Sequence, residues 1–141
     1  MKLLFPVDGS DCALTALDKF ARMVPLFCGT PELVLINVQL PLPYPRAIAL
    51  VGKEVVAQYY EVQSEEELAG ARKRLEQSER TFRVEKRVGD PAQEIVNLAE
   101  SEQCEMIAMG THGRTALKNL VMGSVATKVL AASKVPVLFF K

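Results

Sequence analysis

Apolar residues gather in five short runs along the chain of 141 residues, separated by longer stretches of mixed character. Four of the runs are largely apolar, which is typical of strands buried on both faces of a sheet. The third run alternates apolar and polar residues, as a half-buried strand does. The pattern predicts strands over residues 2–7, 32–38, 81–88, 105–110 and 136–141.

The stretches between these runs predict helices, because apolar residues recur there every three or four positions. Either Ser10 or Asp11 can cap the first helix. Its apolar stripe consists of Leu14, Leu17, Ala21 and Val24. A second helix is predicted over residues 53–79, where glutamates precede basic residues at spacings that suit a solvated face.

Two further helices are predicted in the second half of the chain. One starts at Asp90-Pro91, because proline is favoured at the first helical position. Its buried stripe consists of Ile95, Leu98 and Ala99. The other covers residues 117–133, with a stripe made of Val121, Val125, Val129 and Ala132.

Residues 39–52 interrupt this alternation with prolines at alternate positions, Pro41, Pro43 and Pro45. Proline lacks a backbone N–H and clashes with the preceding helical turn. The segment is therefore predicted to be an extended, surface-exposed loop and not a regular helix.

Strands and helices alternate throughout, with no internal repeat and no sign of a second domain. Parallel strands need long right-handed crossovers, which the helices supply. We therefore expect a single α/β domain over residues 1–141 with an open five-stranded parallel sheet, order 3-2-1-4-5, and helices on both faces. In that order the winding reverses between the first and fourth strands, where ligands bind at the carboxyl ends.

The composition excludes several classes of protein. The formal net charge is zero, which argues against a general nucleic-acid or membrane-surface binder. The apolar runs are far shorter than the roughly 20 residues that span a bilayer, and no signal-peptide cleavage site follows Met1. We expect a cytosolic protein.

The three cysteines, Cys12, Cys28 and Cys104, are widely separated, and His112 is the only histidine. A structural zinc site needs four nitrogen or sulfur ligands in a defined spacing, which this chain lacks. We expect no metal site and no disulfide framework, but buried free thiols.

Three glycines stand in the stretch MGTHGRTALKNLVMGS: Gly110, Gly113 and Gly123, the last followed by Ser124. Because they lack Cβ atoms, the chain can turn tightly and a ligand can approach the backbone closely. A helix that starts after Gly123 would offer free N–H groups and the positive end of its dipole to a phosphate. No Glu or Gln stands at position 127 to form a capping box with those donors.

Charge is distributed unevenly along the chain. Residues 106–141 contain five basic residues and no Asp or Glu, whereas the rest of the chain has a net charge of −5. The expected crevice between residues 7–10 and 109–113 thus lies beside a basic segment. This favours an anionic ligand with several phosphates. The P-loop motif and the Gly-x-Gly-x-x-Gly fingerprint are both absent.

Together, Gly110-x2-Gly113-x9-Gly123-Ser124, the opening FPVDGS and the final VPVLFFK resemble the ATP-binding branch of the universal stress protein family. The resemblance runs the full length of the chain. It implies a Rossmann-like fold, similar to that of adenine nucleotide alpha hydrolases, with ATP at the switch point. Magnesium would be held mainly by the phosphates, because the basic segment supplies no carboxylate.

The resemblance also implies which residues bind the nucleotide. Around the nucleoside it places Pro6, Val7, Asp8, Val38, Met109 and Gly110. Around the ribose and phosphates it places Gly113, Gly123, Ser124 and Val125. Ala126 stands where relatives often have a hydroxyl residue, so only its backbone N–H can serve there. The proline-rich segment would form one wall of the adenine pocket.

Plainer interpretations of the same residues stay open. Asp8 and Ser124 could each serve only as a helix cap, and the glycines only as turns. His112 could touch a phosphate or be an exposed loop residue. Arg114 and Lys118 could be ordinary solvated charges.

We expect a cytosolic stress-response regulatory protein whose nucleotide state alters its contacts with partners. No obvious base stands beside the expected phosphates, so at most slow ATP hydrolysis is expected. The alternatives are a slow ATPase enzyme and a nucleotide-independent interaction protein. The resemblance implies a homodimer joined through the C-terminal strand PVLFF, an apolar edge that needs covering. Burial under the chain's own helices is the alternative for that strand.

Overall fold

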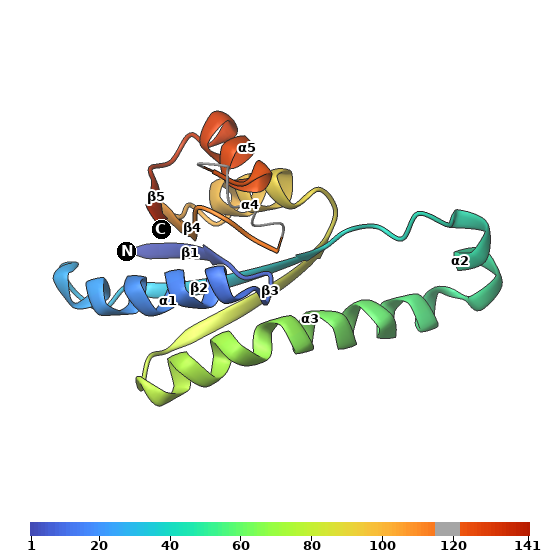
Figure 1. Ribbon diagram of the computed structural model, residues 1–141, viewed down its shortest axis with the longest axis horizontal. Coiled ribbons are helices and arrows are strands. Elements are labelled where there is room, and N and C mark those ends of the chain that lie inside the picture. Colours follow the sequence, from blue (N-terminus) through green and yellow to red (C-terminus); the bar gives the residue numbers. More distant parts are fainter. Residues whose placement is uncertain (115–121) are drawn as a thin grey trace.

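The computed structural model describes residues 1–114 and 122–141. In this part of the chain, five parallel strands form one sheet in the order β3-β2-β1-β4-β5 (Figure 1). The strands are β1 (Lys2–Pro6), β2 (Glu32–Gln39), β3 (Phe82–Val88), β4 (Met106–Gly110) and β5 (Val137–Phe140). The predicted fold class and strand order are confirmed.

Helices cover both faces of the sheet (Figure 1). The described helices are α1 (Asp11–Met23), α2 (Pro45–Val51), α3 (Lys53–Gln77), α4 (Pro91–Ser101), α5 (Ser124–Ala132) and the short 3-10 helix η1 (Val24–Leu26). Helices α1 and α3 pack on one face, whereas α4 and α5 pack on the other. The sheet is therefore the middle layer of three.

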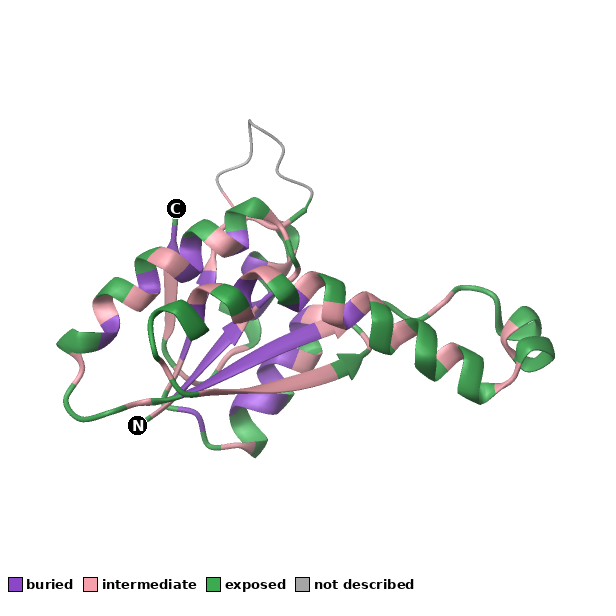
Figure 2. Ribbon diagram, turned by 90° about the horizontal axis from the view of Figure 1, so that it is seen from below, coloured by how far each residue is buried: buried purple, intermediate pink, exposed green. Residues whose placement is uncertain are grey.

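Alternate residues of β1 and β2 belong to the two cores. Leu3 and Phe5 pack with α1 and α3, whereas Leu4 packs with α4 and α5. All three side chains are fully buried, and the buried strands lie at the centre of Figure 2. The nearly continuous apolar runs are explained by this burial on both faces.

Helix α1 is capped by Ser10, one of the two N-cap residues expected from the sequence. The Ser10 hydroxyl accepts a hydrogen bond from the N–H of Ala13, so Ser10 is the N-cap. The buried face of the helix is made of Ala13, Ala16, Leu17 and Phe20. The predicted stripe was thus partly wrong, because Leu14 and Ala21 are only half-buried at its margins.

The prediction that residues 39–52 form no regular helix was wrong in part. Residues 40–44 are irregular, but α2 follows from Pro45 to Val51. Pro45 occupies the first helical turn, where its missing N–H costs nothing, and no proline follows within the helix. Gly52, with φ of 89°, separates α2 from α3.

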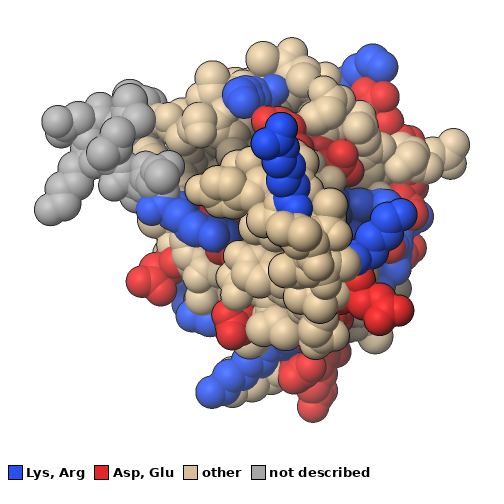
Figure 3. Space-filling model, turned by 90° about the vertical axis from the view of Figure 1, so that its right-hand side faces the viewer, with Lys and Arg blue, Asp and Glu red and all other residues tan. Residues whose placement is uncertain are grey.

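Helix α2 and the first part of α3 extend away from the sheet (Figures 1 and 2). Several of their apolar side chains are exposed, namely Leu50, Val51, Val55, Tyr59 and Val62. Figure 3 views the molecule from this end, where uncharged atoms fill the middle of the surface and charges of both signs surround them. Because much of α3 faces solvent, its sequence mixes polar and apolar residues without one continuous apolar stripe.

The beginning of the final predicted helix lies outside the described residues. The structure describes this helix from Ser124, whereas the predicted beginning included Leu117, Lys118 and Val121.

All three cysteines are free, but only Cys104 is buried, so the expectation of buried thiols was wrong for Cys12 and Cys28. Burial raises the pKa of the Cys104 thiol. Among the described residues, no helix combines the length and apolar character that a membrane span needs.

Candidate functional site

A cavity of about 780 Å³ lies at the carboxyl ends of β1, β2 and β4; we call it the carboxyl-end cavity. It sits where the strand order reverses between β1 and β4. All ten residues predicted for the nucleotide site line this cavity: Pro6, Val7, Asp8, Val38, Met109, Gly110, Gly113, Gly123, Ser124 and Val125. Residues more than a hundred positions apart therefore meet because parallel strands end at the same edge.

Asp8 is held firmly at the tip of β1. Its Oδ1 accepts hydrogen bonds from the N–H of Ser10 at 3.0 Å and from the Ser10 hydroxyl at 2.6 Å. Its Oδ2 accepts from the N–H of Arg114 at 3.2 Å. A carboxylate has about four acceptor positions, and these hydrogen bonds from described residues use three of them. Asp8 thus supports the cap residue Ser10 and also faces the cavity.

The glycines are needed for close approach and not for unusual backbone angles. None of Gly110, Gly113 and Gly123 has a positive φ, so no left-handed backbone angle requires glycine at these positions. A Cβ on Gly113 would lie only 2.5 Å from Oδ2 of Asp8. A Cβ on Gly123 would lie 3.3 Å from the carbonyl oxygen of Thr111. These glycines let the strand tips converge.

The first turn of α5 points amide donors at the carboxyl-end cavity. Gly123 is the N-cap, so Ser124 is the first helical residue and not the cap. The N–H of Gly123 is used, since it donates to the Thr111 carbonyl at 2.7 Å. No side chain of the described residues caps this helix, so the N–H groups of its first turn remain available to an anion.

A buried polar network supports the same edge of the sheet. Asn37, fully buried in β2, donates through Nδ2 to the Val7 carbonyl at 2.8 Å and to Oε2 of Glu67 at 2.7 Å. Gln39 donates to Oδ1 of Asn37 at 3.0 Å. Glu67 also forms an ion pair with Arg114, whose Nε donates to the Asp8 carbonyl at 3.0 Å. The network fixes Asp8 relative to α3.

Much of this hydrogen-bond network, and part of the wall of the carboxyl-end cavity, was not predicted from the sequence. Asn37 did give a signal, because it is a polar residue inside the apolar run ELVLINV. Tyr59 and Gln63 of α3 and Ile95 of α4 also line the carboxyl-end cavity, and nothing in their local sequence distinguishes them.

The proline-rich segment forms one wall of the carboxyl-end cavity, as expected, through residues 40–43. The Tyr60 hydroxyl accepts a hydrogen bond from the N–H of Leu42 at 2.8 Å, which ties this wall to α3. His112 is half-buried and lines the cavity, with Nδ1 3.0 Å from the Thr111 hydroxyl, so it is not simply an exposed loop residue. Lys118, the other expected cation, is not among the described residues.

The chemistry of the lining suits binding of an anion. Asp8 is the only carboxylate among the described lining residues, and no cluster in the described chain could hold a metal ion on its own. Just outside the cavity, the carboxylate of Asp90 accepts a hydrogen bond from the N–H of Gln93 and also lies near Lys128. The hydrogen bond and the nearby positive charge both lower the pKa of Asp90. That carboxylate is therefore engaged as the N-cap of α4.

Comparison with known proteins matches this architecture. The sequence model of the universal stress protein family covers residues 1–141. The chain belongs to the universal stress protein family. A universal stress protein of Methanocaldococcus jannaschii is 31% identical over 140 residues, which cover 99% of this chain and 81% of that protein.

Solved structures of family members share the fold. The structure of hypothetical protein MJ0577, from the same archaeon, superposes with a TM-score of 0.80 at 30% identity, covering 99% of this chain and 94% of that one. A universal stress family protein of Arabidopsis thaliana, solved with AMP bound, has a TM-score of 0.71 at 13% identity. That match covers all of this chain and 91% of the plant chain, and it concerns the fold alone.

Proposed function

We propose that this member of the universal stress protein family belongs to the ATP-binding branch and acts as a regulatory protein. In this proposal ATP occupies the carboxyl-end cavity, and its presence changes the contacts made with partners. The observation that supports it most directly is the convergence of all ten expected residues on one cavity. A cytosolic location agrees with three free thiols, two of them exposed.

The two ends of the carboxyl-end cavity suit the two ends of a nucleotide. Apolar side chains at the ends of β1 and β2 and from the proline-rich wall, including Val7 just after β1 and Val38 in β2, can enclose a flat base. The uncapped first turn of α5 can receive phosphates, and its segment has no acidic residue. A volume of about 780 Å³ lies within the range of small-molecule sites.

Fold-level relatives add support, since the Arabidopsis protein binds AMP. The choice of ATP rests on the resemblance and on the basic segment that follows Gly110. Magnesium would be held mainly by the phosphates. Asp8, the single carboxylate among the described lining residues, already accepts three hydrogen bonds.

Titration calorimetry with ATP and magnesium tests the site, with Gly113→Val as the variant that should bind more weakly. The new Cβ would displace Oδ2 of Asp8, so we expect at least about tenfold weaker binding, or about 1.4 kcal/mol. Ala132→Val is the control, because it also introduces a valine, but at an exposed position of α5 outside the cavity. Wild-type protein that shows no saturable binding would refute the proposal and favour an interaction protein.

The alternative of an enzyme is tested separately by single-turnover hydrolysis. Phosphoryl transfer requires a group that positions the nucleophile, and the described lining residues include no unengaged carboxylate. We therefore expect a turnover far below the ~1–100 s⁻¹ of kinases. A rate within that range would establish an enzyme.

A further inference from the structure

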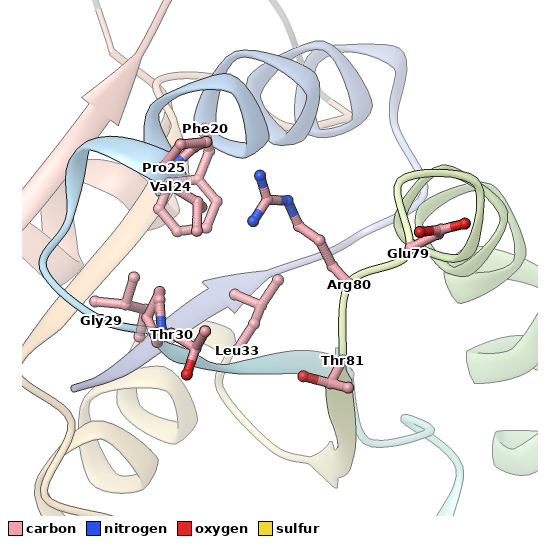
Figure 4. A pocket seen from close by; sticks show the side chains of 11 residues that line it. Phe20, Val24, Pro25, Gly29, Thr30, Leu33, Glu79, Arg80 and Thr81 are labelled. Atoms are coloured by element: carbon pink, nitrogen blue, oxygen red, sulfur yellow. The ribbon is translucent and has the colours of Figure 1, made fainter.

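A second cavity, of about 280 Å³, lies at the opposite end of the sheet; we call it the amino-end cavity. It is formed by the residues that precede or begin β1, β2 and β3 and by the end of α1 (Figure 4). None of its lining residues lines the carboxyl-end cavity. It is therefore a separate site by position.

Apolar side chains form the floor of the amino-end cavity. Leu3, Phe20 and Leu33 belong to the core and are at most 4% exposed. Val24 and Pro25 extend this apolar wall at the end of α1. Thr30 and Thr81 provide polar edges. A ligand here would need a compact apolar body.

The guanidinium of Arg80 points into the amino-end cavity toward Phe20 and Val24 (Figure 4). One nitrogen, Nη2, donates to the Ala21 carbonyl at 3.0 Å, which anchors the side chain. The Nε atom is buried and has no hydrogen-bond acceptor among the described residues. That atom is closed off from solvent, so a ligand would be bound by the outer nitrogens of the guanidinium, which form strong charge-assisted hydrogen bonds to carboxylates.

Among the half-buried arginines of the described chain, only Arg80 lacks a carboxylate partner. Five arginines form ion pairs with Asp or Glu within the described chain: Arg72, Arg74, Arg83, Arg87 and Arg114. Arg22 and Arg46 are exposed. Arg80 is half-buried, forms no ion pair with a described residue, and the side chain of neighbouring Glu79 turns away from it in Figure 4.

From this geometry we propose that the amino-end cavity binds a small monocarboxylic acid with a compact apolar body. The carboxylate would accept from the outer nitrogens of the Arg80 guanidinium, and the apolar body would rest on Phe20 and Leu33 (Figure 4). A charge-assisted hydrogen bond of this type is shorter and stronger than a neutral one. The volume falls just below the usual range for drug-sized ligands, so the acid must be small.

An NMR titration of the full chain with benzoate, and with benzyl alcohol as its neutral counterpart, tests this site. We expect saturable shifts at the amides of Thr30, Leu33 and Thr81, with benzoate at least about tenfold tighter than the alcohol. Arg80→Leu should weaken benzoate at least about tenfold and leave the alcohol unchanged. Arg87→Leu, which removes an exposed arginine of β3 outside the amino-end cavity, should leave both unchanged.

Equal affinity for acid and alcohol in the wild-type protein, or no saturable shift up to about 10 mM, would refute the proposal. In that case Arg80 would serve only to hold the last turn of α1. The wild-type comparison decides the matter even if Arg80→Leu does not fold. The same titration with ATP present separates this site from the proposed nucleotide site, because binding at the amino-end cavity should persist.

Discussion

Single polar residues determine the geometry of the carboxyl-end cavity. Asn37 is fully buried in β2 and makes three hydrogen bonds, to Val7, Glu67 and Gln39. Its amide thereby joins the tip of β1 to α3, the helix that supplies one wall of the cavity. A polar side chain at this position replaces apolar packing with a defined arrangement of the strand tips.

We predict that Asn37→Leu destabilises the fold by about 1–3 kcal/mol, because it removes the amide donor to Oε2 of Glu67 and to the Val7 carbonyl, although Glu67 keeps its ion pair with Arg114. Asn97→Leu, at an exposed position of α4, should change stability by less than about 0.5 kcal/mol. Urea unfolding followed by circular dichroism measures both. Similar losses in the two variants would show that the Asn37 network contributes little.

The sequence allowed the lining residues to be predicted better than the hydrogen bonds among them. The ends of parallel strands meet at one edge, so motifs after the first and fourth runs had to converge. The partners of Asn37 and Arg114 depend on how α3 lies across the sheet, which local pattern does not reveal. For the same reason the role of Gly113 could not be predicted, since it depends on where Oδ2 of Asp8 lies.

At the scale of elements, ion pairs join β3 to α3. Lys86 lies near Glu61 at 2.5 Å and also pairs with Glu65. The hydrogen bond from Lys86 holds the pKa of Glu65 below its ordinary value, with Arg72 adding to the effect. Both glutamates are substantially exposed, so the pairs contribute modestly, about 0.5–1 kcal/mol.

The lowered pKa of Glu65 gives this contribution a definite pH dependence. A carboxylate with a depressed folded-state pKa stabilises the fold above its unfolded-state pKa, and the effect is lost as the pH falls through the folded-state value. We predict that Lys86→Met lowers stability by about 0.5–1 kcal/mol at about pH 7 and by less at about pH 3. Urea midpoints at both pH values measure this. Lys73→Met removes an exposed lysine without a described ion pair, and it should show no such pH dependence.

The elements themselves were mostly predictable, and the exceptions have physical causes. Because β1 and β2 are buried on both faces, their sequences are nearly continuous apolar runs, and these runs allowed the strands to be predicted. Helix α2 was missed because three alternating prolines dominated the interpretation, although Pro45 begins the helix instead of preventing it. The apolar side chains of α2 are exposed, so no stripe distinguished this helix from a loop.

At the scale of the whole molecule, β5 is the edge of the sheet and offers a surface for assembly. The helices of the same chain cover β5 only partly, since the side chains of Val137, Leu138 and Phe139 are half-buried. The carbonyls of Pro136 and Phe140 accept from β4 and the residue after it, so by alternation Val137 and Phe139 direct their backbone groups outward. We propose that this edge pairs with that of a second copy.

Val137→Pro removes one outward N–H while leaving the bonds to β4 in place, and Val137→Ala is its matched control. Both remove the branched valine side chain, but only proline lacks the donor. We predict that the wild-type protein and Val137→Ala sediment as dimers and that Val137→Pro sediments as a monomer. A wild-type monomer, or three identical profiles, would exclude this mode of assembly.

The two cavities lie at opposite ends of the same strands. Leu3 borders one and Pro6 the other, so about 10 Å of β1 separates them. Two ligands placed this way never touch, and any influence between them must pass through the packed strands. Thermodynamic reciprocity then applies: whatever factor an acid imposes on nucleotide affinity, the nucleotide must impose on the acid.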